Sequence, residues 1–171
     1  MYTQVPSSGG LVAFAACRPS MSQIPPHAKT VSCISADLRF ESPRERRIIK
    51  RYPHLVRDLT DCYLGTDRPD RVGKCTYYSN AYFLVTRQNH EERPPLMSIQ
   101  KAIRNLARQT TAESTLVFNL TEDDLACYEV ETIMRILGNE FSRPIPRRSK
   151  PLVLFLCLPK ENMSSNLPNG I

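Results

Sequence analysis

The sequence predicts a three-layer α/β/α sandwich around a mixed, mostly parallel β-sheet. Apolar runs of strand length alternate along the chain with amphipathic segments of helical length, an order typical of a sheet covered by helices. Several of these runs, such as Leu152–Leu158, are apolar on both faces, and a strand of that kind is buried from both sides. Helices are therefore expected above and below the sheet.

Six segments have the length and composition of strands. They are Leu11–Cys17, Thr30–Ala36, Lys74–Tyr78, Tyr82–Thr86, Thr115–Asn119 and Leu152–Leu158. The short stretch Ser79–Ala81 separates the two tyrosine-rich runs and is typical of a hairpin turn. One pair of neighbouring strands is therefore expected to be antiparallel.

Four segments are expected to form helices: Pro43–Tyr52, the chain after Pro53, Met97–Thr110 and about Asp124–Leu137. The clearest is Met97–Thr110, in which apolar residues recur at helical spacing opposite lysine and arginines. Asp124–Leu137 has acidic residues in its first turn, and Gly138 is predicted to stop it.

Length and composition indicate one domain, since 171 residues fit a single hydrophobic core. We place the domain at residues 11–158, between a flexible N-terminal tail over 1–10 and a flexible C-terminal tail over 159–171. Both tails are rich in Ser, Gly, Pro and Asn and lack periodicity. The longest apolar run is far shorter than the roughly 20 residues that a membrane helix needs, so no membrane partner is expected.

The six cysteines stand singly, with no C-x-x-C pair and no histidine at a zinc-ligand spacing. We therefore expect no metal site and no cofactor, and interpret the cysteines as reduced core residues. Reduced thiols are typical of nuclear or cytoplasmic proteins, where we expect this chain to lie as a monomer. The glycines form neither a Gly-x-Ser-x-Gly elbow nor a P-loop, which excludes those two enzyme classes.

The charge of the chain is moderately basic, with a net charge of +6 and a pI of 9.1. The excess is concentrated in two patches, Arg44–Arg51 and Arg143–Lys150. Clustered cations favour an anionic partner, and nucleic acid is one candidate. In the alternative interpretation, the arginines of the first patch are only the solvated face of a helix that has Ile48 and Ile49 on its apolar face.

The stretch Cys33–Leu38 (CISADL) resembles the one with which small macrodomains of the terminal ADP-ribose protein glycohydrolase type leave a central strand. The similarity spans about residues 10–158. Its further pieces are Ile49–Leu59, Tyr77–Arg87, Pro94–Leu106 and the pair Tyr128-Glu129. The resemblance implies a macrodomain fold with ADP-ribose or ADP-ribosylated protein as its ligand. The ligand-binding residues that it implies are Ser35, Asp37, Arg44, Arg87 and Asp123.

The two phosphate-binding loops are where the sequence departs from this resemblance. The family has a Gly-x-Gly loop where this chain has Phe40–Pro43; Glu41 adds a negative charge there, and Pro43 lacks an N–H. The second glycine-rich loop falls on Leu120–Asp124, which is crowded with acids. Both changes oppose the binding of a diphosphate. The resemblance also places the loop of His90 near the ligand, but we interpret His90 as a solvated loop residue.

The resemblance implies a lysine nucleophile at the position of Arg87 and an assisting aspartate at Asp124, or at Asp123 if the loop is shifted by one residue. An arginine stays protonated and cannot attack a sugar carbon as a free amine could. Asp124 is therefore a catalytic candidate only if the chain is active. Both aspartates also suit an ordinary helix N-cap.

The leading interpretation is a divergent, non-catalytic macrodomain-like binding or interaction module. The alternatives are an active ADP-ribosyl-protein hydrolase, a reader that holds the diphosphate with Arg44, Arg47 or Arg87, and a nucleic-acid-binding domain that uses Arg44–Arg51 and Arg143–Lys150. A scaffold that binds only protein is the fourth.

Overall fold

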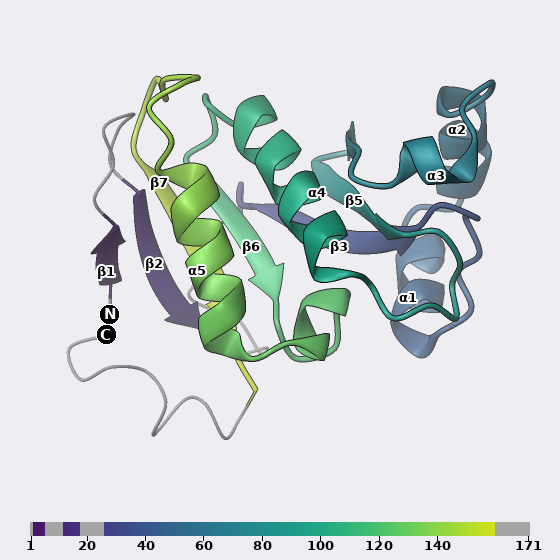
Figure 1. Cartoon of the computed structure of the whole chain (residues 1–171), viewed down its shortest axis with the longest axis horizontal. Coiled ribbons are helices and arrows are strands. Elements are labelled where there is room, and N and C mark those ends of the chain that lie inside the picture. The colour runs from purple at the N-terminus through teal and green to yellow at the C-terminus, as the bar shows by residue number, and fades with distance from the viewer. Residues whose placement is uncertain (1, 6–11, 18–25, 160–171) are drawn as a thin grey trace.

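The computed structural model describes residues 2–5, 12–17 and 26–159, which form a seven-stranded β-sheet with helices on both faces (Figure 1). The strands lie in the order β1-β2-β7-β6-β3-β5-β4. Their bounds are β1 Tyr2–Val5, β2 Val12–Cys17, β3 Lys29–Ser35, β4 Cys75–Tyr78, β5 Ala81–Arg87, β6 Thr115–Asn119 and β7 Leu152–Cys157. The central strands are parallel to one another, and the edge strands β1 and β4 are antiparallel to their neighbours. The predicted mixed, mostly parallel sheet is confirmed.

The hairpin between β4 and β5 is the antiparallel pair that the sequence predicts. Its turn residues Ser79 and Asn80 have φ angles of 49° and 66°. Two successive positive φ angles match the twist of a tight two-residue hairpin, and asparagine tolerates this conformation well.

Strand β1 differs from the sequence prediction, because Tyr2–Val5 lie inside the predicted N-terminal tail. Tyr2 pairs with Ala15 and Val5 pairs with Val12, so the segment extends the sheet at its edge. Such an edge pairing uses backbone hydrogen bonds and needs no apolar periodicity, which is why composition did not reveal it. The other residues of the two predicted tails lie outside the described residues, except 159.

The helices are α1 Pro43–Arg51, α2 Leu55–Cys62, α3 Arg68–Arg71, α4 Leu96–Gln109 and α5 Val130–Phe141, and a 3₁₀ turn η1 covers Asp124–Cys127. The predictions for α1, α2 and α4 are confirmed to within a residue or two at each end, whereas α3 was not predicted. Within the described part of the chain, no helix has both the length and the apolar character that a membrane crossing requires.

The predicted helix from Asp124 to Leu137 is wrong in two respects. The chain is extended at Tyr128 and Glu129, which separates η1 from α5. The Tyr128 hydroxyl donates a hydrogen bond to the Pro94 carbonyl oxygen at 2.8 Å, and this contact lies outside the reach of local helical periodicity. Helix α5 also continues past Gly138, because the buried Phe141 outweighs the roughly 1 kcal/mol that a glycine costs in a helix.

Two groups of helices cover the two faces of the sheet. α4 and α5 lie side by side on one face (Figure 1) and bury Ile103 and Leu137 against it. α1 and α2 cover β3 and β5 on the other face, where Leu55 and Leu59 are buried. Because β6, β3 and β5 are parallel neighbours, their carboxyl ends meet at one edge of the sheet, the usual place for a ligand crevice. We call it the carboxyl edge.

Candidate functional site

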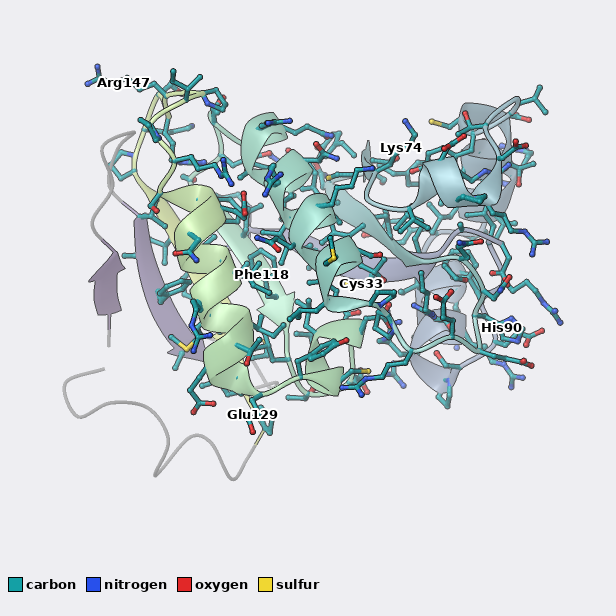
Figure 2. The ribbon with its side chains drawn as sticks, viewed as in Figure 1. Cys33, Lys74, His90, Phe118, Glu129 and Arg147 are labelled. Atoms are coloured by element: carbon teal, nitrogen blue, oxygen red, sulfur yellow. The ribbon has the colours of Figure 1, made fainter. Side chains whose placement is uncertain are left out.

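Five charged residues meet beneath the carboxyl edge, and we call them the ion cluster: Arg44, Glu45, Arg87, Asp123 and Asp124. The first two belong to the first turn of α1, Arg87 ends β5, and the aspartates open η1 after β6. Four of the five are buried, and Arg44 is half-buried. Cys33 of β3, labelled in Figure 2, contacts the cluster through its backbone N–H and carbonyl groups. The C-terminal part of β3, the end of β5, the loop after β6 and the start of α1 thus share one charged centre.

Arg87 lies at the middle of the ion cluster with an exposed fraction of 4%. Its Nη1 donates to Asp124 Oδ2, and its Nη2 donates to Glu45 Oε2 at 3.0 Å. Thr86 Oγ1 also donates to Asp124 Oδ2, at 2.5 Å. The guanidinium is therefore held between two carboxylates and is not directed toward solvent.

Arg44 closes the other side of the ion cluster. Its Nη1 donates to the Cys33 carbonyl oxygen at 3.0 Å, and its guanidinium nitrogens lie 3.5 Å from carboxylate oxygens of Asp123 and Asp124. Burial lowers the pKa of Arg44, but the charges of these two carboxylates raise the pKa by more than burial lowers it, so the net shift is upward. The solvated-face interpretation is wrong for Arg44, whose side chain is only 12% exposed, whereas Arg47 and Arg51 are exposed as that interpretation requires.

Asp123 satisfies backbone donors beneath the second loop. Its carboxylate accepts the N–H of Cys33 at 3.2 Å and the N–H of Asp124 at 2.7 Å. Burial raises the pKa of Asp123 to about 6, with Arg44 lowering it and Asp124 raising it. The N-cap interpretation is confirmed for Asp123, which caps η1. It is wrong for Asp124, whose carboxylate pairs with Arg87.

The first predicted phosphate loop is closed by a capping box at the start of α1. The Ser42 N–H donates to Glu45 Oε1 at 3.1 Å, and the Glu45 N–H donates to Ser42 Oγ at 3.1 Å. Helix N-terminal amides are the groups that usually bind a phosphate. Here a side chain of the helix itself occupies them, and the same Glu45 carboxylate also holds Arg87.

A pocket of about 440 Å³ lies beside the ion cluster, over the loops that follow β3 and β5. Its lining residues are Asp37, Arg39, Arg68, Asn89, His90, Glu91 and Glu92. Asp37 accepts hydrogen bonds from Ser35 Oγ at 2.6 Å, from the Arg39 N–H at 3.1 Å and from the His90 N–H at 3.0 Å. Burial raises the pKa of Asp37, but these hydrogen bonds outweigh it and hold the pKa at about 2.

His90 joins the two loops that form this pocket. Its Nδ1 lies 3.2 Å from Asp37 Oδ2, and its Nε2 lies 2.7 Å from Glu41 Oε2. The side chain is 13% exposed and contacts two carboxylates, so the prediction of a solvated loop histidine is wrong. Figure 2 labels His90 in the loop that follows β5. No local pattern indicates these contacts, since the two carboxylates belong to a loop about fifty residues earlier in the chain.

No protein-family model matches the chain, and no curated protein matches it in sequence. Solved structures do match. The macrodomain of Thermus aquaticus DarG superposes with a TM-score of 0.64 at 8% identity, over 86% of this chain and 99% of that one. The chain has a macrodomain fold. The macrodomain of Mycobacterium tuberculosis DarG matches with a TM-score of 0.60 at 12% identity, over 82% and 97% of the two chains. A macrodomain protein from Streptomyces coelicolor matches with a TM-score of 0.55 at 11% identity, over 83% and 97%.

The macrodomain fold brings the predicted ligand residues together as two groups. Arg44, Arg87 and Asp123 belong to the ion cluster, whereas Asp37 lies at the wall of the adjacent pocket and the buried Ser35 donates a hydrogen bond to it. The described residues hold no group of three or more His, Cys, Asp or Glu suited to a metal ion.

Sequence reasoning missed Glu45 as a member of this candidate site. The spacing of Ser42 and Glu45 is that of a capping box, S-x-x-E, and could have indicated the start of α1. No local pattern indicates that the second oxygen of that carboxylate contacts Arg87, which lies 42 residues further along the chain.

Proposed function

We propose that this macrodomain is a binding module that does not hydrolyse ADP-ribose linkages. The observation that carries the proposal is the buried Arg87, held between Asp124 and Glu45. The resemblance noted above implies a lysine nucleophile at this position. A guanidinium remains protonated at any physiological pH, so Arg87 offers no free electron pair with which to attack a sugar carbon.

The aspartate that the resemblance implies for catalysis is also occupied. Asp124 accepts from Arg87 and from Thr86, and it is buried. A general base must come within hydrogen-bond reach of the proton that it removes. Asp124 would have to break an ion pair before it could do so, which supports the absence of turnover.

The backbone donors that would hold a diphosphate are taken by carboxylates of the chain itself. The Ser42 N–H donates to Glu45, and the N–H groups of Cys33 and Asp124 donate to Asp123. A diphosphate would have to displace these internal anions while it approached further acids. This arrangement argues against the usual mode of phosphate binding at a helix N-terminus.

ADP-ribose or ADP-ribosylated protein is the second part of the proposal, and the adjacent pocket supports it. A volume of about 440 Å³ falls within the range of roughly 300–1,000 Å³ typical of small-molecule sites. Arg39 and Arg68 lie at the wall of this pocket, and both are exposed. Each donates from one guanidinium nitrogen to a neighbouring side chain, Arg39 to Glu41 and Arg68 to Asn89, and each guanidinium has further N–H donors. Guanidinium groups bind phosphates through paired N–H donors, so they could replace the missing glycine amides.

Incubation with mono-ADP-ribosylated protein tests the absence of turnover. We expect no release of ADP-ribose above the rate in buffer alone. Release that Asp124→Asn abolishes, and that the exposed loop variant Glu122→Gln preserves, would overturn the proposal. Circular dichroism of both variants must show an intact fold.

Calorimetric titration with free ADP-ribose tests the ligand separately from the chemistry. We expect heat at micromolar ligand that Arg39→Ala/Arg68→Ala abolishes and that Arg46→Ala, an exposed arginine on α1, leaves unchanged. Absence of heat at millimolar ligand would remove ADP-ribose from the proposal. The non-hydrolytic module would then bind through a protein surface.

The first basic patch, Arg44–Arg51, supports nucleic-acid binding less than its sequence indicated. Arg44 is committed to the ion cluster, and Arg47 forms an ion pair with Glu122. Only part of Arg44–Arg51 is therefore available to phosphates, and nucleic-acid binding stays a prediction.

We further propose a nuclear or cytoplasmic location, which the free thiols support. Cys33, Cys62, Cys75 and Cys127 form no disulfide in the described part of the chain. Reducing compartments keep cysteines in that state.

A further inference from the structure

The second basic patch lies at the opposite end of the sheet from the ion cluster. Helices α4 and α5 both run away from the carboxyl edge, and the segment after α5 carries Arg143–Lys150. Figure 2 shows this separation along α5, with Glu129 at its start and Arg147 beyond its far end. We call this end of the sheet the amino edge.

A small pocket at the amino edge gathers cations from two segments. Its lining includes Arg104 and Arg108 of α4, and Arg143 and Arg148 after α5. Glu140 is the carboxylate among the lining residues. Four guanidinium groups around one carboxylate leave a clear positive excess, which suits an anionic group.

Glu140 orients two of these arginines toward the surface. Its carboxylate accepts from Arg104 Nε at 3.0 Å and from Arg143 Nε at 2.8 Å, and Glu140 itself is buried. Burial raises the pKa of Glu140, but the hydrogen bonds from both arginines outweigh it and lower the pKa. The two guanidinium groups stay partly exposed, so they are fixed in place and still accessible.

Arg148 is the least satisfied cation of the pocket. It is 8% exposed, and among the described residues none accepts a hydrogen bond from its buried Nε. Its Nη2 donates to the carbonyl oxygens of Thr110 and Glu113, and its guanidinium lies 5.8 Å from the centre of the Phe141 ring. Arg148 forms no ion pair among the described residues. Burial lowers its pKa, and the charge of Glu113 offsets part of that effect. A buried cation without a paired carboxylate favours the arrival of an anion.

An apolar side chain stands among these cations. Ile145 is 82% exposed and lies between Pro144 and Pro146, in a run of five consecutive exposed residues, 143–147. The pocket has a volume of about 10 Å³, so it admits a single small group and not a whole ligand. A partner would insert one oxyanion there and lay an apolar group over Ile145.

The geometry points to the amino edge as a docking surface for an acidic protein segment in which carboxylates alternate with apolar side chains. Carboxylates complement Arg104, Arg108, Arg143 and Arg148, and an apolar side chain of the partner covers Ile145. Nucleic acid fits this surface less well, because Phe141, the aromatic residue of the lining, is buried and offers no face on which a base could stack. This surface goes beyond the proposed function and does not depend on Arg87.

Fluorescence anisotropy with defined probes tests the docking surface. The probe is a fluorescein-labelled peptide of alternating glutamate and leucine, measured at low and at physiological salt. The comparison probes are polyglutamate, a lysine-leucine peptide of equal length, and single-stranded oligothymidine. We expect the glutamate-leucine peptide to bind most tightly, and the lysine-leucine peptide not to bind.

Charge reversal locates the binding. Arg108→Glu/Arg147→Glu changes two exposed side chains, and we expect it to weaken binding by about tenfold or more. Arg46→Glu/Lys50→Glu makes the same change of charge on α1 and should leave binding unaltered. Ile145→Ser should weaken binding of the glutamate-leucine peptide but not of polyglutamate.

Three outcomes would overturn the proposal. Equal weakening by the two double reversals would mean non-specific attraction to a basic protein. Tighter binding of oligothymidine than of the peptide, lost in Arg108→Glu/Arg147→Glu, would make the amino edge a nucleic-acid interface. Absence of binding by every probe, with the variants folded by circular dichroism, would leave no docking surface at the amino edge.

Discussion

Two buried arginines at opposite edges of the sheet are held in opposite ways. Arg87 at the carboxyl edge lies between the carboxylates of Asp124 and Glu45. Arg148 at the amino edge is supported by backbone carbonyl oxygens and by the Phe141 ring, with no ion pair among the described residues. A buried ion needs counter-charge, so the first site is closed by the chain itself, whereas the second can accept an outside anion.

Arg87→Met should produce the largest effect. The substitution removes the ion-pair partner of Glu45 and, among the described residues, leaves Asp124 with only its 3.5 Å ion-pair contact to Arg44. Breaking a buried ion pair in this way typically costs about 3–5 kcal/mol. Chemical unfolding measures the loss. The matched control is Arg87→Met/Glu45→Gln/Asp124→Asn, which removes the charge on both sides and should recover most of the stability. A loss below about 1 kcal/mol in the single variant would show that Arg87 does not hold the cluster together.

The two edges should respond to pH with opposite signs. Asp123 has its folded pKa raised to about 6, above an unfolded value of about 3.9, so its favourable contribution is complete below about pH 4 and is lost as the pH rises through 6. Glu140 has its folded pKa lowered, so its contribution is present above the unfolded value of about 4.3 and is lost as the pH falls through the folded pKa.

Unfolding curves between pH 4 and pH 7 measure the response at the carboxyl edge. Between the ends of this range, the stability of the wild-type chain relative to Asp123→Asn should fall by about 2 kcal/mol as the pH rises. Glu140→Gln serves as the comparison at the amino edge. Near the lower end of this pH range, the stability of the wild-type chain relative to Glu140→Gln should rise as the pH rises. The same slope for both variants would break the contrast between the edges.

Arg148→Met should have a smaller effect than Arg87→Met. It leaves neutral carbonyl oxygens without a donor and no buried carboxylate, at an expected cost of about 1–2 kcal/mol. The exposed Arg147→Met is its control and should change the free energy of unfolding by no more than about 0.5 kcal/mol. If Arg148→Met costs as much as Arg87→Met, Arg148 stabilises the fold by more than its hydrogen bonds and its contact with the Phe141 ring account for.

The elements whose apolar pattern is local were predictable from the sequence. β6 has its predicted bounds, Thr115–Asn119, and α4 follows the helical spacing of Ile99, Ile103 and Leu106. These segments bury a continuous apolar face, so their own composition determines their form. The division of η1 from α5 was not predictable, because it depends on the contact between Tyr128 and Pro94.

The candidate site was predictable only as a set of positions. The resemblance indicated Arg44, Arg87, Asp123 and Asp124, and the structure brings these four together. It could not indicate their partners, since Glu45 contacts Arg87 across 42 residues, and Asp123 contacts the Cys33 N–H across 90. Glu41 shows the same limit: predicted to repel a phosphate, it lies in contact with Arg39 and His90.

The sequence by itself determined the alternation of strands and helices, the macrodomain resemblance and the absence of glycine from residues 40–43 and 120–124. Each of these features depends on residues that are close together in the sequence, since periodicity and backbone freedom are local properties. Only the tertiary structure decided that the carboxyl edge neutralises its own charges while Arg148 at the amino edge remains without an ion pair in the described chain. Charge balance depends on which distant side chains share a low-dielectric space, and that sharing is a property of the folded chain alone.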